Sequence, residues 1–248
     1  MLLIAGALRC QKETISEKWT TDEIIRRAVF TATMARNRFA HILQFIRFDD
    51  ESTRVQRKVN DKLAAIREVW DQFLENCKKL FEPFEDMTVD EQLVAFRGKC
   101  PMRQDMKSKP AKYGIKVWAA ADVKTSYLYN LQVYTGKLPG YAPEKNVGHR
   151  VVCDLMEPLF GTGRGVTTDN FFPSVPTAEF LLQKNITLTG TLRAKKPDIP
   201  AMMEAAKGRD LLSSKCIFSD GLAVVSYIPK KNKTVRVLST QFLDDFIG

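Results

Sequence analysis

The sequence predicts an α/β fold, with a mixed sheet at its centre built in the order β-β-β-α-β-α-β. Three observations support this prediction. Residues 1–85 carry apolar side chains at helical spacing, residues 86–196 alternate strand and helix patterns, and residues 197–248 show three further strand patterns. We therefore expect a helical region, a mixed-sheet core and a partial β-rich domain with these bounds.

The helical region contains three amphipathic stripes. They run over residues 24–29, 34–46 and 63–80, where apolar side chains recur at the spacing of one helix face. Residues 49–54, between the second and third stripes, are polar and mostly charged, so we expect a loop there.

The core begins with a partly alternating strand and a basic loop, followed by two strands whose short connection predicts an antiparallel hairpin. Two helical segments then alternate with two strands. This is the order of a ribonuclease-H-like core, in which right-handed crossovers place the helices on defined faces of one sheet. The expected elements are strands at 87–96, 115–121 and 126–134, a helix at 147–159, a strand at 165–168, a helix at 175–184 and a strand at 187–193.

The last part of the chain contains a short helix candidate and three strand patterns. An Asp-Gly turn and a lysine-rich turn separate the strands, which is typical of a small antiparallel unit. The expected elements are a helix at 202–206 and strands at 214–219, 222–228 and 234–239.

The charge balance favours a polyanionic partner. The chain has 38 Lys and Arg residues against 29 Asp and Glu residues, a net charge of +9 with a pI near 9.3. Such a surplus attracts nucleic acid, although many soluble proteins are moderately basic and charge alone does not establish DNA as the partner.

The five cysteines predict neither a zinc site nor a disulfide framework, because they are scattered, odd in number and form no Cys-x-x-Cys pair. Reduced thiols fit the cytosol or the nucleus. No apolar stretch reaches the length of a membrane-spanning helix, so we expect no membrane partner.

Two aspartates are notable for their positions. Asp90 lies in the first core strand, and Asp169 directly follows the fourth. Because these strands are neighbours in the expected topology, the two carboxylates can meet and hold Mg²⁺ or Mn²⁺ for phosphoryl transfer. Two simpler explanations stay open: Asp169 is also placed to form a turn or cap the next helix, and Asp90 to lie on a solvated strand face.

The loop at residues 97–112 is strongly basic and follows the strand that carries Asp90. A positive loop there would hold a phosphate backbone over the metal ions. The alternative is a solvated, mobile surface loop. Its candidate DNA-binding residues are Arg97, Lys99, Arg103, Lys107, Lys109 and Lys112, against a single acid, Asp105.

Several segments of the chain resemble the piggyBac family of transposases. Thr88–Lys99 is similar to the first-aspartate motif of that family, and Val166–Phe172 to its second-aspartate motif. The remaining similar segments are 36–39, 47–50, 61–67, 108–116 and 190–193 with Lys196. The resemblance covers nearly the whole chain.

The resemblance implies a transposase that cuts and joins DNA strands with Mg²⁺ held by three aspartates. Asp90 would be the first of these and Asp169 the second. It also implies that the helical region serves dimerisation and DNA binding, and that the part after residue 196 belongs to an insertion domain. A nuclear homodimer acting on DNA, without a small-molecule substrate, is the corresponding expectation.

The sequence departs from the family pattern at its third aspartate. That residue is expected in a Gly-Gly-Val-Asp-type motif beyond the insertion domain, and the surroundings of Asp244 and Asp245 do not match it. A Cys-rich zinc-binding domain is not found either, and the chain opens inside a helical pattern. We therefore predict that this chain alone does not cut DNA, and interpret it as a truncated or degenerate copy or as a domesticated DNA-binding or assembly protein.

Overall fold

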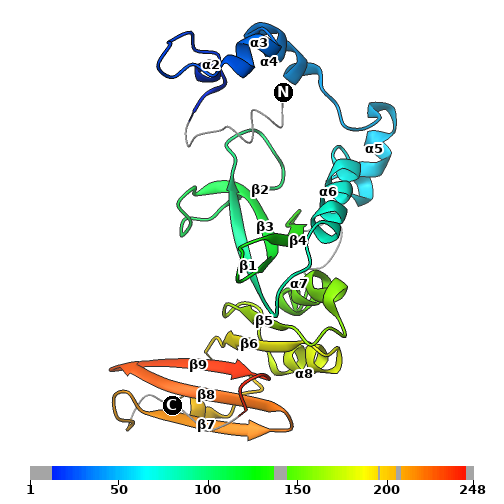
Figure 1. Ribbon diagram of the computed structural model, residues 1–248. Helices are drawn as coiled ribbons and strands as arrows, with labels where there is room; N and C mark the ends of the chain where they lie inside the picture. Colours follow the sequence, from blue (N-terminus) through cyan, green and yellow to red (C-terminus); the bar gives the residue numbers. More distant parts are fainter. Residues whose placement is uncertain (1–12, 137–143, 195, 205–207, 244–248) are drawn as a thin grey trace. The chain divides into compact units, whose positions relative to one another are not determined.

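The computed structural model describes residues 13–136, 144–194, 196–204 and 208–243 (Figure 1). The chain divides into two compact units between Glu68 and Val69. The regional bounds expected at residues 85 and 196 stay a prediction. The first residues of the chain, Asp244 and Asp245, for which the sequence made predictions, lie outside the described residues.

The first unit is helical, as expected, and has a small aromatic core. The Trp19 ring lies 5.2 Å from the ring of Phe30 and 5.0 Å from that of Phe39, and all three side chains are buried. The helices are α2 (Ile15–Lys18), α3 (Ala28–Thr33), α4 (Arg36–Phe45) and α5 (Glu51–Asn60).

Two local expectations in this unit were wrong. The helix expected at 24–29 begins only at Ala28, because the Asp22 carboxylate accepts the Ile24 amide and favours a turn over a helix. The loop expected at 49–54 contains the start of α5, where the Asp50 side chain caps the Ser52 amide at 2.9 Å.

Asp49 fixes the start of α5 from outside the helix. Its carboxylate accepts hydrogen bonds from Arg54 at 2.6 Å and from Arg57 at 2.6 Å. The Arg54 hydrogen bond, with help from Arg57, holds the pKa of Asp49 at about 2. Two arginines one helical turn apart are thus paired with one carboxylate just before the helix.

The second unit has a single mixed sheet, and the expected element order is confirmed with one addition. The segment at 97–112, which was expected to be only a loop, contains a short strand, β2. This strand forms because residues 103–105 pair with the start of β3. The elements are α6 (Arg67–Lys79, which crosses the division), β1 (Asp86–Ala95), β2 (Arg103–Asp105), β3 (Tyr113–Asp122), β4 (Leu128–Val133), α7 (Val147–Met156), the 3₁₀ turn η1 (Glu157–Leu159), β5 (Gly165–Thr168), α8 (Val175–Gln183), β6 (Thr187–Thr191), the 3₁₀ turn η2 (Ala201–Met203), β7 (Ser214–Ser219), β8 (Leu222–Lys230) and β9 (Lys233–Ser239).

The order across the sheet is β2-β3-β1-β5-β6-β9-β8-β7, with β4 also paired to β3 (Figure 1). Strand β1 runs antiparallel to β3 and parallel to β5, and β5 runs parallel to β6. The three last strands continue this sheet, because β9 pairs antiparallel with β6. Among the described helices, none combines the length and the apolar composition needed to span a bilayer.

Helices α7 and α8 both pack on one face of the sheet. Met87, Val166 and Leu188 are register partners on β1, β5 and β6, and all three are almost completely buried in the main core. Leu155 of α7 and Leu181 of α8 belong to the same buried cluster. Side chains alternate along a strand, so the intervening residues of β1, β5 and β6 face away from these helices.

A buried carboxylate joins the entry of β1 to the hairpin between β3 and β4. Asp122 is 1% exposed and accepts hydrogen bonds from the Phe84 amide at 2.8 Å, the Thr125 amide at 2.7 Å and the Thr125 hydroxyl at 2.6 Å. Burial alone would raise its pKa, but these donors lower the pKa below its usual value.

We expect Asp122→Ala to lower the free energy of unfolding by about 1–3 kcal/mol, because it leaves three partly buried donors without their acceptor. Asp122→Asn keeps one acceptor oxygen and should cost less. Urea unfolding measures both, with Glu157→Ala, at an exposed position, as the control. Equal stability of Asp122→Ala and the control would contradict this role.

Candidate functional site

Asp90 lies in β1, and Asp169 directly follows β5, the parallel neighbour of β1. The last register pair of β1 and β5 is Val89 with Thr168, so each aspartate is the next residue after that pair. Val89 and Thr168 are buried, whereas both aspartates are exposed. The fold therefore brings the two predicted site residues together, on the side of the sheet that faces away from α7 and α8.

Each aspartate uses one oxygen in a local hydrogen bond. The Oδ1 atom of Asp90 accepts the Glu91 amide at 2.6 Å, and that of Asp169 accepts the Phe171 amide at 2.9 Å. Asp169 thus forms the turn that leads from β5 towards α8, which is the turn-forming role given above as an alternative to metal binding. Turn formation leaves its second oxygen available, so it does not exclude metal binding.

The donor set fits a hard divalent cation. Both side chains are exposed carboxylates, and oxygen ligands with open coordination positions are what Mg²⁺ and Mn²⁺ take when they also bind phosphate. Within the described ranges, no group of three His, Cys, Asp or Glu side chains is arranged to hold a metal. The site geometry therefore rests on this pair.

A glycine lets the Asp169 turn lie close over the next strand. A Cβ atom at Gly190 of β6 would lie 2.6 Å from the Thr168 hydroxyl, 2.6 Å from Cγ of Pro173 and 2.9 Å from the Thr168 carbonyl oxygen. These contacts are shorter than any real Cβ makes. The segment from Thr168 to Pro173 can keep its path only while position 190 has no side chain.

Two cations contact the same turn, Lys116 from β3 and Arg193 from the segment after β6. The Arg193 Nε atom donates to the Asn170 side chain at 3.0 Å, and its guanidinium lies 5.2 Å from the Phe171 ring centroid. The Lys116 Nζ atom lies 5.6 Å from the same ring. Sequence reasoning assigned neither residue a role, since only the fold brings β3 and the end of β6 to this turn.

The basic loop is tied to the strand that carries Asp90. Lys109 donates to the Glu91 backbone carbonyl at 3.2 Å and lies 3.7 Å from its carboxylate, while Lys116 pairs with that carboxylate at 2.5 Å. Burial would raise the pKa of Glu91, but Lys116 and Lys109 lower it below its usual value. Glu91 therefore connects the loop, β1 and β3 next to Asp90.

The other predicted DNA-binding residues remain at the surface. Arg103 donates to the backbone carbonyls of Arg97 and Gly98, and both Arg103 and Lys112 lie within 6 Å of the Tyr113 ring. These contacts give the loop a defined path. The residues whose side chains are exposed are Arg97, Lys99, Arg103, Lys107 and Lys112.

A family model described as Transposase IS4 matches residues 1–246 of the chain. The chain belongs to this transposase family. Its relatives are of the piggyBac type. The human PiggyBac transposable element-derived protein 3 is 26% identical over 179 residues, which cover 71% of this chain and 30% of that protein. The human Chimeric ERCC6-PGBD3 protein is 26% identical over 179 residues, which are 16% of its length.

A solved structure supports the same assignment. A piggyBac transposase in a synaptic complex with hairpin DNA is 33% identical, with a TM-score of 0.88. The match covers 100% of this chain and 51% of that one. The chain therefore spans about half of the solved transposase, and its matches cover a smaller share of the two human proteins. The expected piggyBac ancestry and the ribonuclease-H-like fold of this transposase chain are confirmed.

We expect Gly190→Ala to displace the Asp169 turn, because the added methyl meets backbone and a proline ring. The free energy of unfolding should fall by about 1–3 kcal/mol. The backbone amide NMR shifts of residues 168–172 measure the displacement, and thermal unfolding measures the loss of stability. Gly98→Ala is the matched control, since its Cβ would meet only the Phe96 ring, which can turn away. Equal effects of the two variants would contradict the close approach.

Proposed function

We propose that the chain provides part of a DNA strand-cleavage and strand-transfer site, with Asp90 and Asp169 as two of its metal ligands. The observation that supports this proposal is the parallel pairing of Val89 with Thr168, because each exposed aspartate is the next residue after this pair. Membership of a transposase family supports it.

In this proposal the free oxygens of the two carboxylates bind Mg²⁺ or Mn²⁺. A bound divalent pair would activate an attacking oxygen and stabilise the leaving oxygen of a phosphodiester. The chain's own contribution is to orient the carboxylates: the Glu91 amide holds one, and the Phe171 amide holds the other.

The basic loop would bind the DNA backbone beside these carboxylates. Lys109 joins the loop to Glu91, and the remaining cations stay exposed to meet phosphates. The solved relative is a transposase bound to hairpin DNA, which supports DNA as the partner. A nuclear location and a homodimeric assembly belong to the same proposal.

Whether this chain cuts DNA by itself is a separate question. Two-metal catalysis needs closely held ions, and the family resemblance accounts for two of three aspartates here. We propose that the isolated chain binds DNA without cutting it. A non-catalytic DNA-binding or assembly role is the second candidate, favoured by a loop whose exposed cations can bind phosphate without any metal.

Salt-dependent DNA binding tests the role of the loop. Replacing Arg97, Lys99 and Lys107 by Ala should weaken binding of a labelled duplex and reduce the slope of log K against log salt by up to about 3, at roughly 0.9 per lost phosphate contact. Fluorescence anisotropy at several KCl concentrations measures this slope. The matched control replaces Lys230, Lys231 and Lys233, which are also exposed. Equal slopes for the two triple variants would contradict a DNA-binding loop.

Metal binding tests the carboxylate pair without requiring activity. Asp90→Asn and Asp169→Asn should each weaken Mn²⁺ binding measured by electron paramagnetic resonance, because each removes a charged ligand. Asp86→Asn is the control, since Asp86 is exposed on the same strand and the same face. Unchanged Mn²⁺ binding in both variants would refute the site.

A nicking assay with Mg²⁺ or Mn²⁺ tests the proposed inactivity of the isolated chain. Metal-dependent cutting by the chain that is lost in Asp90→Asn would overturn that proposal.

A further inference from the structure

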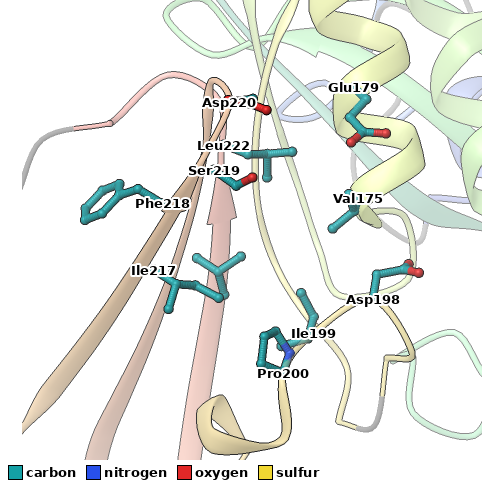
Figure 2. Close-up of a pocket in the computed structure, with 11 residues that line it drawn as sticks. Val175, Glu179, Asp198, Ile199, Pro200, Ile217, Phe218, Ser219, Asp220 and Leu222 are labelled. Carbon is teal, nitrogen blue, oxygen red and sulfur yellow. The ribbon is translucent and has the colours of Figure 1, made fainter.

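A cavity opens between α8, the segment 198–200 and the hairpin of β7 and β8 (Figure 2). Its volume is about 260 Å³. Apolar side chains form its floor: Ile199 is 7% exposed, Leu222 is 8% exposed and Val224 is 5% exposed. Figure 2 shows the Phe218 ring pointing away from this space, so the floor is aliphatic.

The hairpin turn closes one end of the cavity against α8. Gly221 has a φ of +78°, and a Cβ atom there would lie 3.2 Å from the Leu182 side chain. The turn can approach the helix this closely because its second residue is a glycine. The neighbouring Asp220 is thereby held opposite α8, as Figure 2 shows.

Three carboxylates surround the apolar floor. They belong to Glu179 of α8, Asp198 and Asp220, and the lining includes no Lys or Arg. None of the three forms a salt bridge with any residue that the structure describes. Lys196, two residues before Asp198, has a pKa that is lowered mainly by burial and by Arg193, while Asp198 acts in the opposite direction. In a chain with a net charge of +9, this lining is a local reversal of charge.

The chemistry of the cavity excludes two classes of ligand. Its carboxylates repel phosphate, so DNA is not its partner. They do not converge on one metal ion either, since no three acidic side chains in the described ranges are arranged to hold one. A long basic side chain matches both the apolar floor and the carboxylates. Its methylene stem covers apolar surface, and its charged end pairs with carboxylates.

We infer that this cavity is a docking site for a protein segment that inserts an arginine or lysine side chain flanked by apolar residues. Charge complementarity identifies this occupant: an aliphatic floor receives the stem, and Glu179 and Asp220 receive the charge from opposite sides. The inference does not rest on the proposed cleavage site, since the lining of the cavity includes neither Asp90 nor Asp169 nor any cation of the basic loop.

Two labelled peptides test this inference with the full chain. One is Gly-Leu-Arg-Leu-Gly with blocked ends, and the other replaces arginine by citrulline, which keeps the shape and removes the charge. Fluorescence anisotropy should show the arginine peptide binding about threefold or more tightly than the citrulline peptide, as expected for exposed charge pairs acting together. The double variant Glu179→Gln/Asp220→Asn should lose this preference.

Glu157→Gln is the matched control, because it removes one exposed negative charge outside the cavity and should keep the preference. Circular dichroism checks that the double variant stays folded, which is expected because both positions are exposed. Three results would overturn the inference: no binding of the arginine peptide at millimolar concentration, equal binding of the two peptides, or an unchanged preference in the double variant.

Discussion

The parallel pairing of β1 with β5 is the constraint on which the rest of the site depends. These strands are far apart in the sequence, and only their register sets Asp90 beside Asp169. A shift of one residue would turn one carboxylate towards α7 and α8, because side chains alternate across the sheet. The register is held by burial: Met87 and Val166 pair under the helices, and a slip would expose them while burying a charge.

The same burial makes the two faces of the sheet unequal. One face carries the aliphatic core under α7 and α8, and the other carries the aspartates with Thr88 and Thr167. A close approach lies beside the aspartates, since Gly190 allows the turn after Thr168 to cross over β6. Lys116 and Arg193 then fix that turn through Phe171. The turn beside the site is thus held by contacts with β3, with β6 and with Arg193, while both carboxylates are exposed.

Sequence patterns predicted the elements whose signals are local. The bounds of β5 and β7 were predicted to the residue, because each is a short β-branched or alternating run between turn signals. Helix α5 was missed, since it has few apolar residues and its start depends on Asp49 pairing with Arg54 and Arg57. Topology sufficed to put the two aspartates together. The roles of Gly190, Lys116 and Arg193 were not predictable, because they arise from contacts between strands distant in the sequence.

The basic loop and the acidic cavity of this chain lie over different elements of its structure. The basic loop adjoins β1 and β3, where Glu91 forms ion pairs with Lys109 and Lys116 and the other loop cations are exposed to phosphate. Between α8 and the hairpin of β7 and β8, Glu179 and Asp220 face an aliphatic cavity whose lining includes no Lys or Arg. An acidic patch next to the cations would weaken DNA binding by competing for them. Exposed charges are screened over about 8–10 Å at physiological salt, and no cation of the basic loop lines the cavity, so the two surfaces can attract opposite partners.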